Sequence, residues 1–289
     1  MSDVADERWP VALATSSYIA REAAYDVPGG WKVEDPIDPY LGGWDRCEKI
    51  VTASFRPLER FIPQFDALLA DVKGAGFRFV EIWGTHLNPA WATPDHVAAA
   101  REALERHGLT VVSYGADLGT SPQDVVTVCE IGHAIGSPLL GTYPGPFFFD
   151  NRDLVVGIIR DQGFRLLIEN HPHHATPAAI LEEVGDDRSV GVTLDTGWWG
   201  SVGYDAAAAI REIGDRIYHV HLKDVRAVGT HEPCLLGEGC IPIAACLDAL
   251  TEIGYHGAVS LEHLTPTFDP TDDLRRMRLE LGEDDRFEL

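Results

Sequence analysis

Residues 164–174 read FRLLIENHPHH, and the fold and the chemistry of the chain can both be argued from this stretch. It opens with a short apolar run and ends in the polar residues Glu169, Asn170 and His171. A strand that is buried on both faces of a parallel sheet consists of a nearly continuous apolar run. In parallel α/β sheets, ligands bind beyond the carboxyl ends of the strands. We therefore expect Glu169 to lie at the edge of the sheet that carries the active site.

Three later apolar segments repeat this design, and each contains or ends in an acidic residue or a histidine. They are VGVTLD (190–195), IYHVHLK (217–223) and GAVSLE (257–262). An isolated buried charge is costly unless it is paired or coordinates a metal, so these strand ends favour a site for one divalent cation. The side chains expected at this rim are those of Glu169, Asp195, His221 and Glu262.

The same alternation of strand and helix runs through the rest of the chain. Further strands are expected at Val11–Ala14, Phe77–Trp83, Thr110–Tyr114 and Pro138–Gly141. Apolar spacing and end signals predict helices at Ile62–Ala75, Pro94–His107, from about Ser121, and at Asp150–Gln162, Thr176–Val184, Tyr204–Ile213 and Ile241–Ile253. Eight strands, each followed by a helix, predict right-handed βαβ units and a single (β/α)8 barrel over residues 1–289. An open doubly wound sheet is disfavoured because no GxGxxG motif follows the first strand.

Residues 16–55 interrupt this alternation with a long segment rich in proline, glycine and aromatic residues. The segment is too long for a simple connection, so we interpret it as an irregular insertion after the first strand that covers the active face. Its residues Trp31, Tyr40 and Trp44 either line a pocket or pack the insertion against the barrel, and packing is preferred for each. At the other end, residues 270–289 are expected to form a closing helix with an acidic tail.

The overall composition excludes several classes of function. The formal net charge is −23, from 46 acidic and 23 basic residues, which disfavours a nucleic-acid partner. The five cysteines form no CxxC pair, so neither a disulfide framework nor a thiolate zinc site is expected. The sequence contains no signal-peptide pattern and no apolar run of membrane-spanning length, which predicts a cytoplasmic protein without a membrane partner.

Several segments resemble the xylose isomerase-like family of sugar isomerases, epimerases and related lyases. The matching pieces, in chain order, are GFRFVEIW, IENH, LDTGWW, HVHLKD, LGEG and SLEH. The longer segment HVHLKDVR is particularly similar to the inosose dehydratase branch, which eliminates water. The resemblance implies that Glu169 and Glu262 act as an acid/base pair and that Arg226 contacts substrate. It also implies that the metal is held by Glu169, Asp195, His221 and Glu262.

The sequence departs from the family pattern at one position. Many members of the family have a histidine three residues after the aspartate ligand, where this chain has Trp198, followed by Trp199. The difference disfavours a standard epimerase and the abasic-site endonuclease branch. These tryptophans either form an apolar wall for sugar C–H groups or for an attached aromatic ring, or they pack the loop against the barrel.

The expected ligand set indicates the metal and the chemistry. Three carboxylates and one imidazole suit Mn²⁺ or Mg²⁺, with Co²⁺, Fe²⁺ or Zn²⁺ as alternatives. Such a metal would polarise a carbonyl oxygen and stabilise the enediolate that forms when the neighbouring carbon loses its proton. We therefore expect isomerisation or epimerisation of a keto sugar or cyclitol. The alternative is a lyase in which the same enediolate expels water from a keto-inositol or the aglycone from a 3-keto glycoside, C-glycosides included. A non-catalytic binding barrel is the third hypothesis.

Three further residues are candidates for the pocket. His171 follows Glu169 by two positions, so it points to the same side of the strand and could shuttle protons. His86, just after the second strand, is a candidate contact to a substrate hydroxyl. Lys223 shares a strand face with His221 and either contacts substrate or forms a buried ion pair that braces the site. The expected partner is a small sugar or cyclitol, and a homo-oligomer or a small second subunit stays open.

Overall fold

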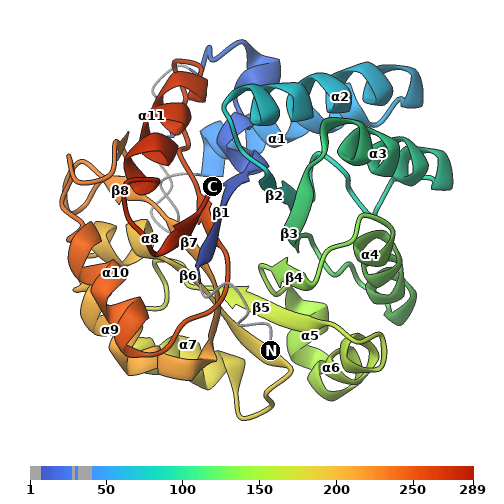
Figure 1. The fold of residues 1–289 in the computed structure, drawn as a ribbon. Coiled ribbons are helices and arrows are strands. Elements are labelled where there is room, and N and C mark those ends of the chain that lie inside the picture. Colours follow the sequence, from blue (N-terminus) through green and yellow to red (C-terminus); the bar gives the residue numbers. More distant parts are fainter. Residues whose placement is uncertain (1–7, 28–29, 32–40) are drawn as a thin grey trace, which may run out of the picture.

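Eight apolar segments form the parallel strands of a closed barrel in the computed structural model, which describes residues 8–27, 30–31 and 41–289 (Figure 1). The barrel strands are β1 (Trp9–Ala14), β2 (Phe79–Trp83), β3 (Thr110–Gly115), β4 (Leu139–Thr142), β5 (Arg165–Glu169), β6 (Val190–Asp195), β7 (Ile217–Leu222) and β10 (Val259–Leu261). Each pairs with its neighbour in the chain, and β10 also pairs with β1, placing Val11 opposite Val259 and Leu13 opposite Leu261. This confirms the predicted (β/α)8 barrel.

Helices surround the barrel and cover the outer face of the strands (Figure 1). They are α2 (Leu58–Gly74), α3 (Pro94–His107), α4 (Pro122–Ala134), α5 (Pro146–Asp150), α6 (Arg152–Asp161), α7 (Pro177–Val184), α8 (Thr196–Ser201), α9 (Ala206–Ile213), α10 (Ile243–Glu252) and α11 (Thr271–Leu281). The helix expected at 150–162 begins later than predicted, because Asn151 has φ −134° and separates α5 from α6. Every residue of β6 is buried, as expected for a strand between the barrel interior and a helical layer.

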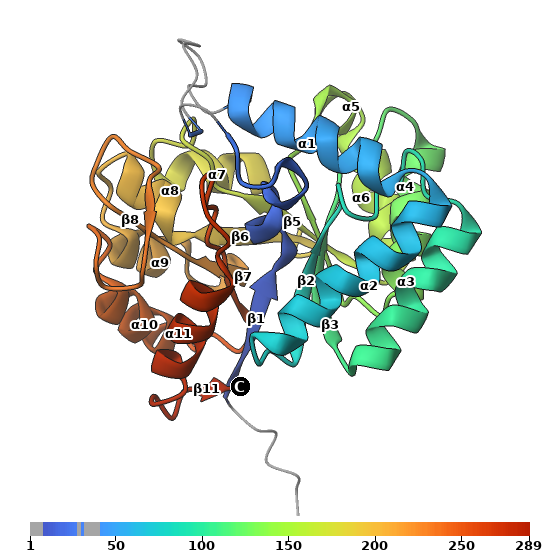
Figure 2. The ribbon, with the colours of Figure 1, turned by 90° about the horizontal axis from the view of Figure 1, so that it is seen from above.

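The segment after β1 is more regular than its composition predicts. It contains the short 3-10 helices η1 (Thr15–Tyr18) and η2 (Arg21–Ala23) and the helix α1 (Leu41–Phe55). The prediction of an irregular insertion is therefore wrong for 41–55, where Cys47, Val51 and Phe55 repeat every four residues and are buried. Figure 2 shows α1 at the end of the barrel toward which β1 runs.

Two tryptophans of this segment attach it to the barrel. The Trp31 side chain is buried, and its Nε1–H donates a hydrogen bond to the carbonyl oxygen of Leu264 (2.8 Å). The ring of Trp44 packs edge-to-face on Trp83, with centroids 5.3 Å apart. Both contacts agree with the packing interpretation of these residues. Tyr40 lies outside the described residues.

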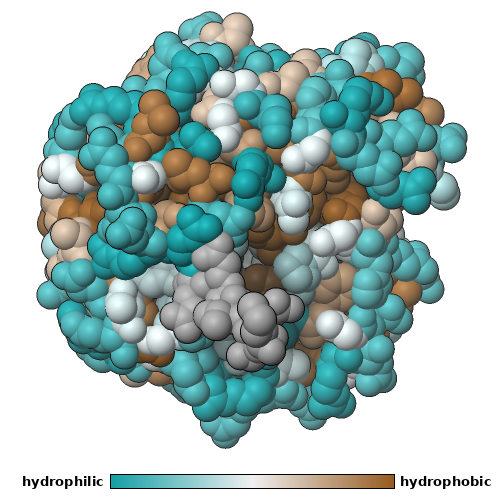
Figure 3. All heavy atoms as spheres, viewed as in Figure 1, coloured by the Kyte–Doolittle hydropathy of each residue, from teal (hydrophilic) through white to brown (hydrophobic). Residues whose placement is uncertain are grey.

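Short strands lie at both ends of the barrel. At the end where β1 begins, β11 (Phe287–Glu288) pairs with β1, and the rings of Trp9 and Phe287 are in contact. Hydrophilic residues cover most of the face on this side of the molecule (Figure 3). At the other end, the β7–α10 loop contains an antiparallel hairpin of β8 (Asp224–Val225) and β9 (Pro233–Cys234).

Asp224 holds this loop together. Its buried carboxylate accepts hydrogen bonds from the backbone N–H groups of Val225 (2.9 Å), Gly237 (2.9 Å), Gly239 (3.0 Å) and Ile241 (3.1 Å). A Cβ atom on Gly239 would lie 2.2 Å from Asp224 Oδ1, so only glycine fits there. The loop is therefore organised around one buried anion.

We expect Asp224→Asn to destabilise the fold, because an amide NH₂ would face N–H donors that need an acceptor. The free energy of unfolding, measured by urea denaturation, should fall by about 2–4 kcal/mol, since each unsatisfied buried donor costs about 1–3 kcal/mol. Glu232→Gln, a change of an exposed side chain on the same hairpin, is the control and should shift stability by less than about 0.5 kcal/mol. Equal stability of the two variants would contradict the role of Asp224.

Candidate metal centre

Four successive barrel strands bring four donor side chains together at one end. Glu169 and Asp195 are the last residues of β5 and β6, His221 lies in β7, and Glu262 directly follows β10. Asp195 and His221 are partners in the β6–β7 ladder. One ligand atom from each of the four residues lies within 4.8 Å of all the others. We call these four residues the cation cluster.

The backbone around Asp195 is held by the residue that follows Glu169. The side chain of Asn170 accepts a hydrogen bond from the Asp195 N–H (2.8 Å) and donates one to the Asp195 carbonyl oxygen (3.1 Å). Asp195 Oδ1 caps α8 by accepting hydrogen bonds from the backbone N–H groups of Gly197 (2.6 Å) and Trp198 (3.1 Å). The other carboxylate oxygen, Oδ2, is the one that faces Lys223. Each oxygen of Asp195 therefore has a separate task.

Lys223 is the cationic neighbour of the cluster. Its buried Nζ lies 2.8 Å from Glu262 Oε2 and 3.5 Å from Asp195 Oδ2. Burial lowers the pKa of Lys223, but the two carboxylates outweigh this effect and raise the pKa above its usual value. The ion pair expected for Lys223 is therefore present, and its partners belong to the cluster, whereas the adjacent Asp224 faces the β7–α10 loop.

The cluster residues affect one another's protonation in different directions. Burial, with Glu262 and Glu169 nearby, raises the pKa of Asp195 to about 7 despite the opposing effect of Lys223. Burial also raises the pKa of Glu169, but the nearby charge of His221, with those of His171 and Lys223, outweighs it and brings this pKa to about 2. Burial lowers the pKa of His221, whereas Glu81 and Glu169 raise it well above its usual value.

The donor set fits a divalent cation. Three carboxylates meet in the cluster, and Lys223 balances one of them. In addition, His221 Nδ1 is buried, lies 3.4 Å from Glu169 Oε1 and has no hydrogen-bond partner among the described residues. Surplus buried negative charge beside an imidazole nitrogen without a hydrogen-bond partner suits a divalent cation that accepts both oxygen and nitrogen ligands. The four cluster residues would hold it.

A row of four aromatic rings borders the cluster. The ring centroid of His171 lies 5.0 Å from that of Tyr143 and 5.2 Å from that of Trp198. The ring centroids of Trp198 and His231 are 4.7 Å apart. Trp198 Nε1–H donates to Glu169 Oε1 at 3.1 Å, and His171 Nε2 lies 3.9 Å from Glu169 Oε2. Tyr143 is 62% exposed. We call these four residues the aromatic arc.

The other sequence candidates lie elsewhere. Trp199 is buried against Tyr204 (centroids 5.3 Å apart), because consecutive helical residues point about 100° apart, so it shares no wall with Trp198. His86 is buried between aromatic rings, and burial lowers its pKa to about 3. Arg226 is half exposed and pairs with Glu232 at 3.8 Å. The side chains that contact His86 and Arg226 lie outside the cation cluster, and the expected substrate contacts of both residues remain predictions.

Three residues near the cluster were missed by sequence reasoning. Ser16 Oγ donates to Glu262 Oε1 at 2.8 Å, and Tyr143 belongs to the aromatic arc. Glu81 accepts hydrogen bonds from His219 and His221. Only Glu81 carried a clear signal, because a carboxylate inside the apolar strand FVEIW needs a buried partner.

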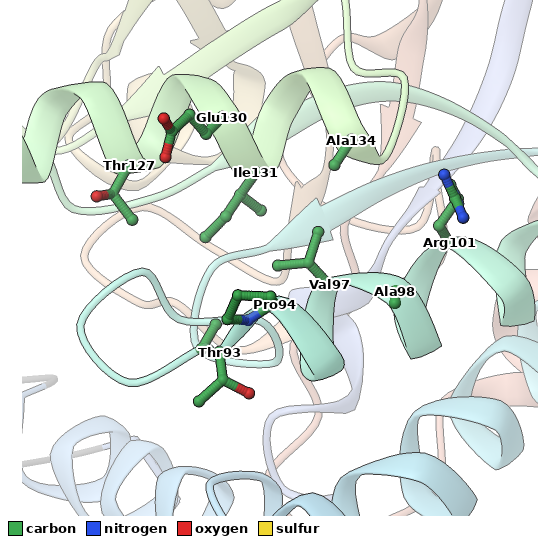
Figure 4. Close-up of a pocket in the computed structure, with 10 residues that line it drawn as sticks. Thr93, Pro94, Val97, Ala98, Arg101, Thr127, Glu130, Ile131 and Ala134 are labelled. Carbon is green, nitrogen blue, oxygen red and sulfur yellow. The ribbon is translucent and has the colours of Figure 1, made fainter.

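A groove of about 420 Å³ lies on the outer surface between α3 and α4 (Figure 4). Its floor is formed by apolar side chains such as Val97 and Ile131, with Arg101 and Glu130 at its edges. None of the residues that line it belongs to the cation cluster. We therefore place the candidate active site at the barrel end and not in this groove.

Comparison with known proteins establishes the family. A family model described as xylose isomerase-like TIM barrel matches residues 69–280, and the chain belongs to this family. It is 33% identical over 124 residues to the uncharacterized protein MJ1311 of Methanocaldococcus jannaschii, covering 40% of this chain and 42% of that protein. The match thus spans less than half of this relative's length.

Two further proteins extend the likeness over more of the chain. An inosose dehydratase of Clostridium beijerinckii is 24% identical over 251 residues, covering 68% of this chain and 81% of the dehydratase. A solved structure of a xylose isomerase-like TIM barrel protein from Mycobacterium smegmatis, in complex with magnesium, has a TM-score of 0.64 at 15% identity. That alignment covers 96% of this chain and 97% of the other, and at this identity it shows the shared fold alone. No helix in the described part of the chain has the length and apolar character needed to span a membrane.

We expect Lys223→Met to destabilise the metal-free protein strongly, because the carboxylates of Asp195 and Glu262 would lose their buried cationic neighbour. Removing one partner of a buried ion pair costs about 3–5 kcal/mol. Denaturation after EDTA treatment should show this loss, and added Mn²⁺ should stabilise the variant more than the unaltered protein. Arg226→Met removes a half-exposed ion pair and should cost less than about 1 kcal/mol. Equal losses of unfolding free energy in the two variants would contradict the role of Lys223 as the buried counter-charge of the cluster.

Proposed function

We propose that this protein is a divalent-metal-dependent enzyme that removes the proton next to the carbonyl group of a keto sugar or cyclitol and returns it to give an isomer or epimer. The observation that carries the proposal is the cation cluster at the carboxyl ends of four successive strands, where (β/α)8 enzymes place their catalytic residues. Membership of the xylose isomerase-like family supports the same class of substrate.

Mn²⁺ is the proposed metal, with Mg²⁺, Co²⁺ and Zn²⁺ as alternatives, because three of the four donors are carboxylates. When bound, the ion supplies a Lewis acid that polarises the substrate carbonyl and stabilises negative charge next to it.

Glu169 and Glu262 are the proposed acid/base pair. They come from β5 and from the end of β10, with β6 and β7 between them, so their carboxylates approach a substrate from different sides. Glu262 is held by Ser16 Oγ and Lys223 Nζ, both at 2.8 Å. Glu169 is held by Trp198 Nε1 at 3.1 Å. Fixed carboxylates of this kind can accept a proton from one carbon and return it to another.

His171 is the proposed link between Glu169 and solvent. Its Nε2 lies 3.9 Å from Glu169 Oε2, and about a quarter of its side chain is exposed. Burial lowers the pKa of His171, while Glu169 acts in the opposite direction. A histidine in this position can exchange a proton with water and pass it to the carboxylate.

A lyase is the second candidate, and the aromatic arc is the observation that favours it. In this reaction the same proton abstraction is followed by loss of a β-leaving group, either water from a keto-inositol or the aglycone of a 3-keto glycoside, C-glycosides included. Tyr143 is exposed, and we propose that it contacts a planar substituent beside the reacting carbon together with the edge of Trp198, whose ring has Lys223 Nζ over one face at 5.1 Å. The inosose dehydratase of C. beijerinckii is a relative whose name denotes loss of water.

Small neutral carbohydrates are the proposed partners, and a cytoplasmic location is proposed with them. The excess of 46 acidic over 23 basic residues supports the exclusion of nucleic acid. A homo-oligomer or a small second subunit remains a prediction from the sequence.

The decisive test is the reaction of Mn²⁺-loaded protein in deuterium oxide with keto sugars, keto-inositols and 3-keto glycosides, followed by NMR. We expect an isomeric product with deuterium at the reprotonated carbon. Glu262→Gln should retain metal, measured by elemental analysis, and lose at least about 100-fold in turnover, because an amide oxygen can coordinate but cannot accept the proton. A clean elimination product without isomer selects the lyase. No change in any carbonyl substrate would reject proton abstraction itself.

The aromatic arc predicts a substrate-dependent effect of one substitution. Trp198→Ala should raise KM for 3-keto glycosides with an aromatic aglycone about 2–10-fold more than for free keto sugars, since stacking contributes about 0.5–1.5 kcal/mol. Trp198→Phe keeps a ring but loses the hydrogen bond to Glu169, so it should preserve most of this preference. The same increase in KM for both substrate types would assign Trp198 to packing.

A further inference from the structure

We propose that Glu81 is a positioning residue that, together with His219, orients the imidazole of His221 so that Nδ1 is the atom presented to the cation. The inference rests on the proposed metal centre, but it concerns residues below it in the barrel. Glu81 lies in β2 and His221 in β7. These strands are not neighbours in the barrel, and the two side chains meet in its interior.

The first observation is the carboxylate shared by two histidines. Glu81 Oε2 accepts a hydrogen bond from His219 Nε2 at 2.8 Å and one from His221 Nε2 at 3.1 Å. Glu81 Oε1 lies 3.2 Å from the same nitrogen of His221. All three residues are buried, and Glu81 is 6% exposed. A carboxylate accepts and does not donate, so each Nε2 in this arrangement carries a proton.

The second observation is the opposite edge of the His221 ring. Nδ1 is buried, without a hydrogen-bond partner among the described residues, and lies 3.4 Å from Glu169 Oε1 of the cation cluster. With Nε2 held by Glu81, Nδ1 is the nitrogen that gives up its proton when a cation binds, and its lone pair then faces the ion. Histidines that bind metals commonly donate their other N–H to a carboxylate, which fixes the ring and makes the ligand more basic.

His219 keeps the shared carboxylate in place. It is two residues from His221 in β7, so both rings project to the same side of the strand. His219 Nε2 also lies 2.9 Å from Ser260 Oγ of β10. Glu81 is therefore tied to strands on the far side of the barrel, and it cannot turn away without leaving a buried charge unpaired.

The same three residues could instead hold a second ion, since their donor atoms also lie within 4.8 Å of one another. The short N–H···O contacts argue against this arrangement, because the nitrogen atoms that would face such an ion already point at the carboxylate. The number of ions bound per chain separates the two possibilities.

The identity of the ligating nitrogen can be read directly by NMR. The full chain, labelled with nitrogen-15 at histidine, is loaded with cadmium-113, a diamagnetic probe with spin one half. We expect one ion per chain and a single histidine ring with cadmium–nitrogen coupling at Nδ1 and a proton at Nε2. The signal is assigned by its loss in His221→Gln. Coupling at Nε2, coupling to His219, or two ions per chain would overturn the proposal while leaving a metal site standing.

A matched pair of substitutions tests the role of the carboxylate. Glu81→Gln keeps the shape but loses the charge and one acceptor, so the Kd for Mn²⁺ should rise about 10–100-fold. Ser260→Ala removes a contact to His219 alone and should change this Kd less than about threefold. The visible spectrum of the Co²⁺-loaded Glu81→Gln protein should also change, because the donor strength of His221 falls. An unchanged Kd and spectrum in this variant would refute the proposal, and failure of the unaltered chain to bind cadmium would remove the metal centre as well.

Discussion

Three carboxylates that lose their hydration at the mouth of an apolar barrel repel one another, and a positive charge has to lie among them. In the structure that charge is the ammonium group of Lys223, 2.8 Å from Glu262 and 3.5 Å from Asp195. Burial raises the pKa of Asp195 to about 7 even beside this lysine, and the charges of Glu262 and Glu169 act in the same direction. Lys223 thus allows the cluster to be assembled before any ion arrives. It leaves a negative surplus that an ion can balance.

In Asp195 and His221, one polar atom of the side chain is hydrogen-bonded within the fold and the other faces the cluster. Asp195 uses Oδ1 to cap α8 and leaves Oδ2 facing the cluster. His221 turns Nε2 to Glu81 and leaves Nδ1 free. Glu262 accepts from Ser16 with one oxygen and from Lys223 with the other. When one polar atom of a side chain is fixed by a hydrogen bond, the other polar atom has few orientations available. The geometry of the cluster is therefore preorganised.

Much of this arrangement could be predicted from the sequence, for a physical reason. The carboxyl ends of the strands in a parallel barrel lie at the same end of the barrel. An apolar run that ends in Glu169 or Asp195 therefore predicts a strand and also places its last side chain at that end. Long-range packing could not be predicted in the same way. The direction of Trp199, the ionic partners of Lys223 and the meeting of Glu81 with His221 depend on which segments lie opposite each other. The helix α1 was missed because glycines and flanking prolines obscured the spacing of Cys47, Val51 and Phe55.

The pairing of β1 with β10 joins segments from opposite ends of the sequence. The hydrogen bond from Ser16 to Glu262 spans 246 positions, as does the one from the His263 N–H to Ser17. Contacts of this length form only after a large loss of chain entropy. During synthesis, the ribosome releases Glu169, Asp195 and His221 long before Glu262. The growing polypeptide therefore carries three residues of the cation cluster without the last, and the complete cluster appears together with barrel closure, as one of the final events of folding.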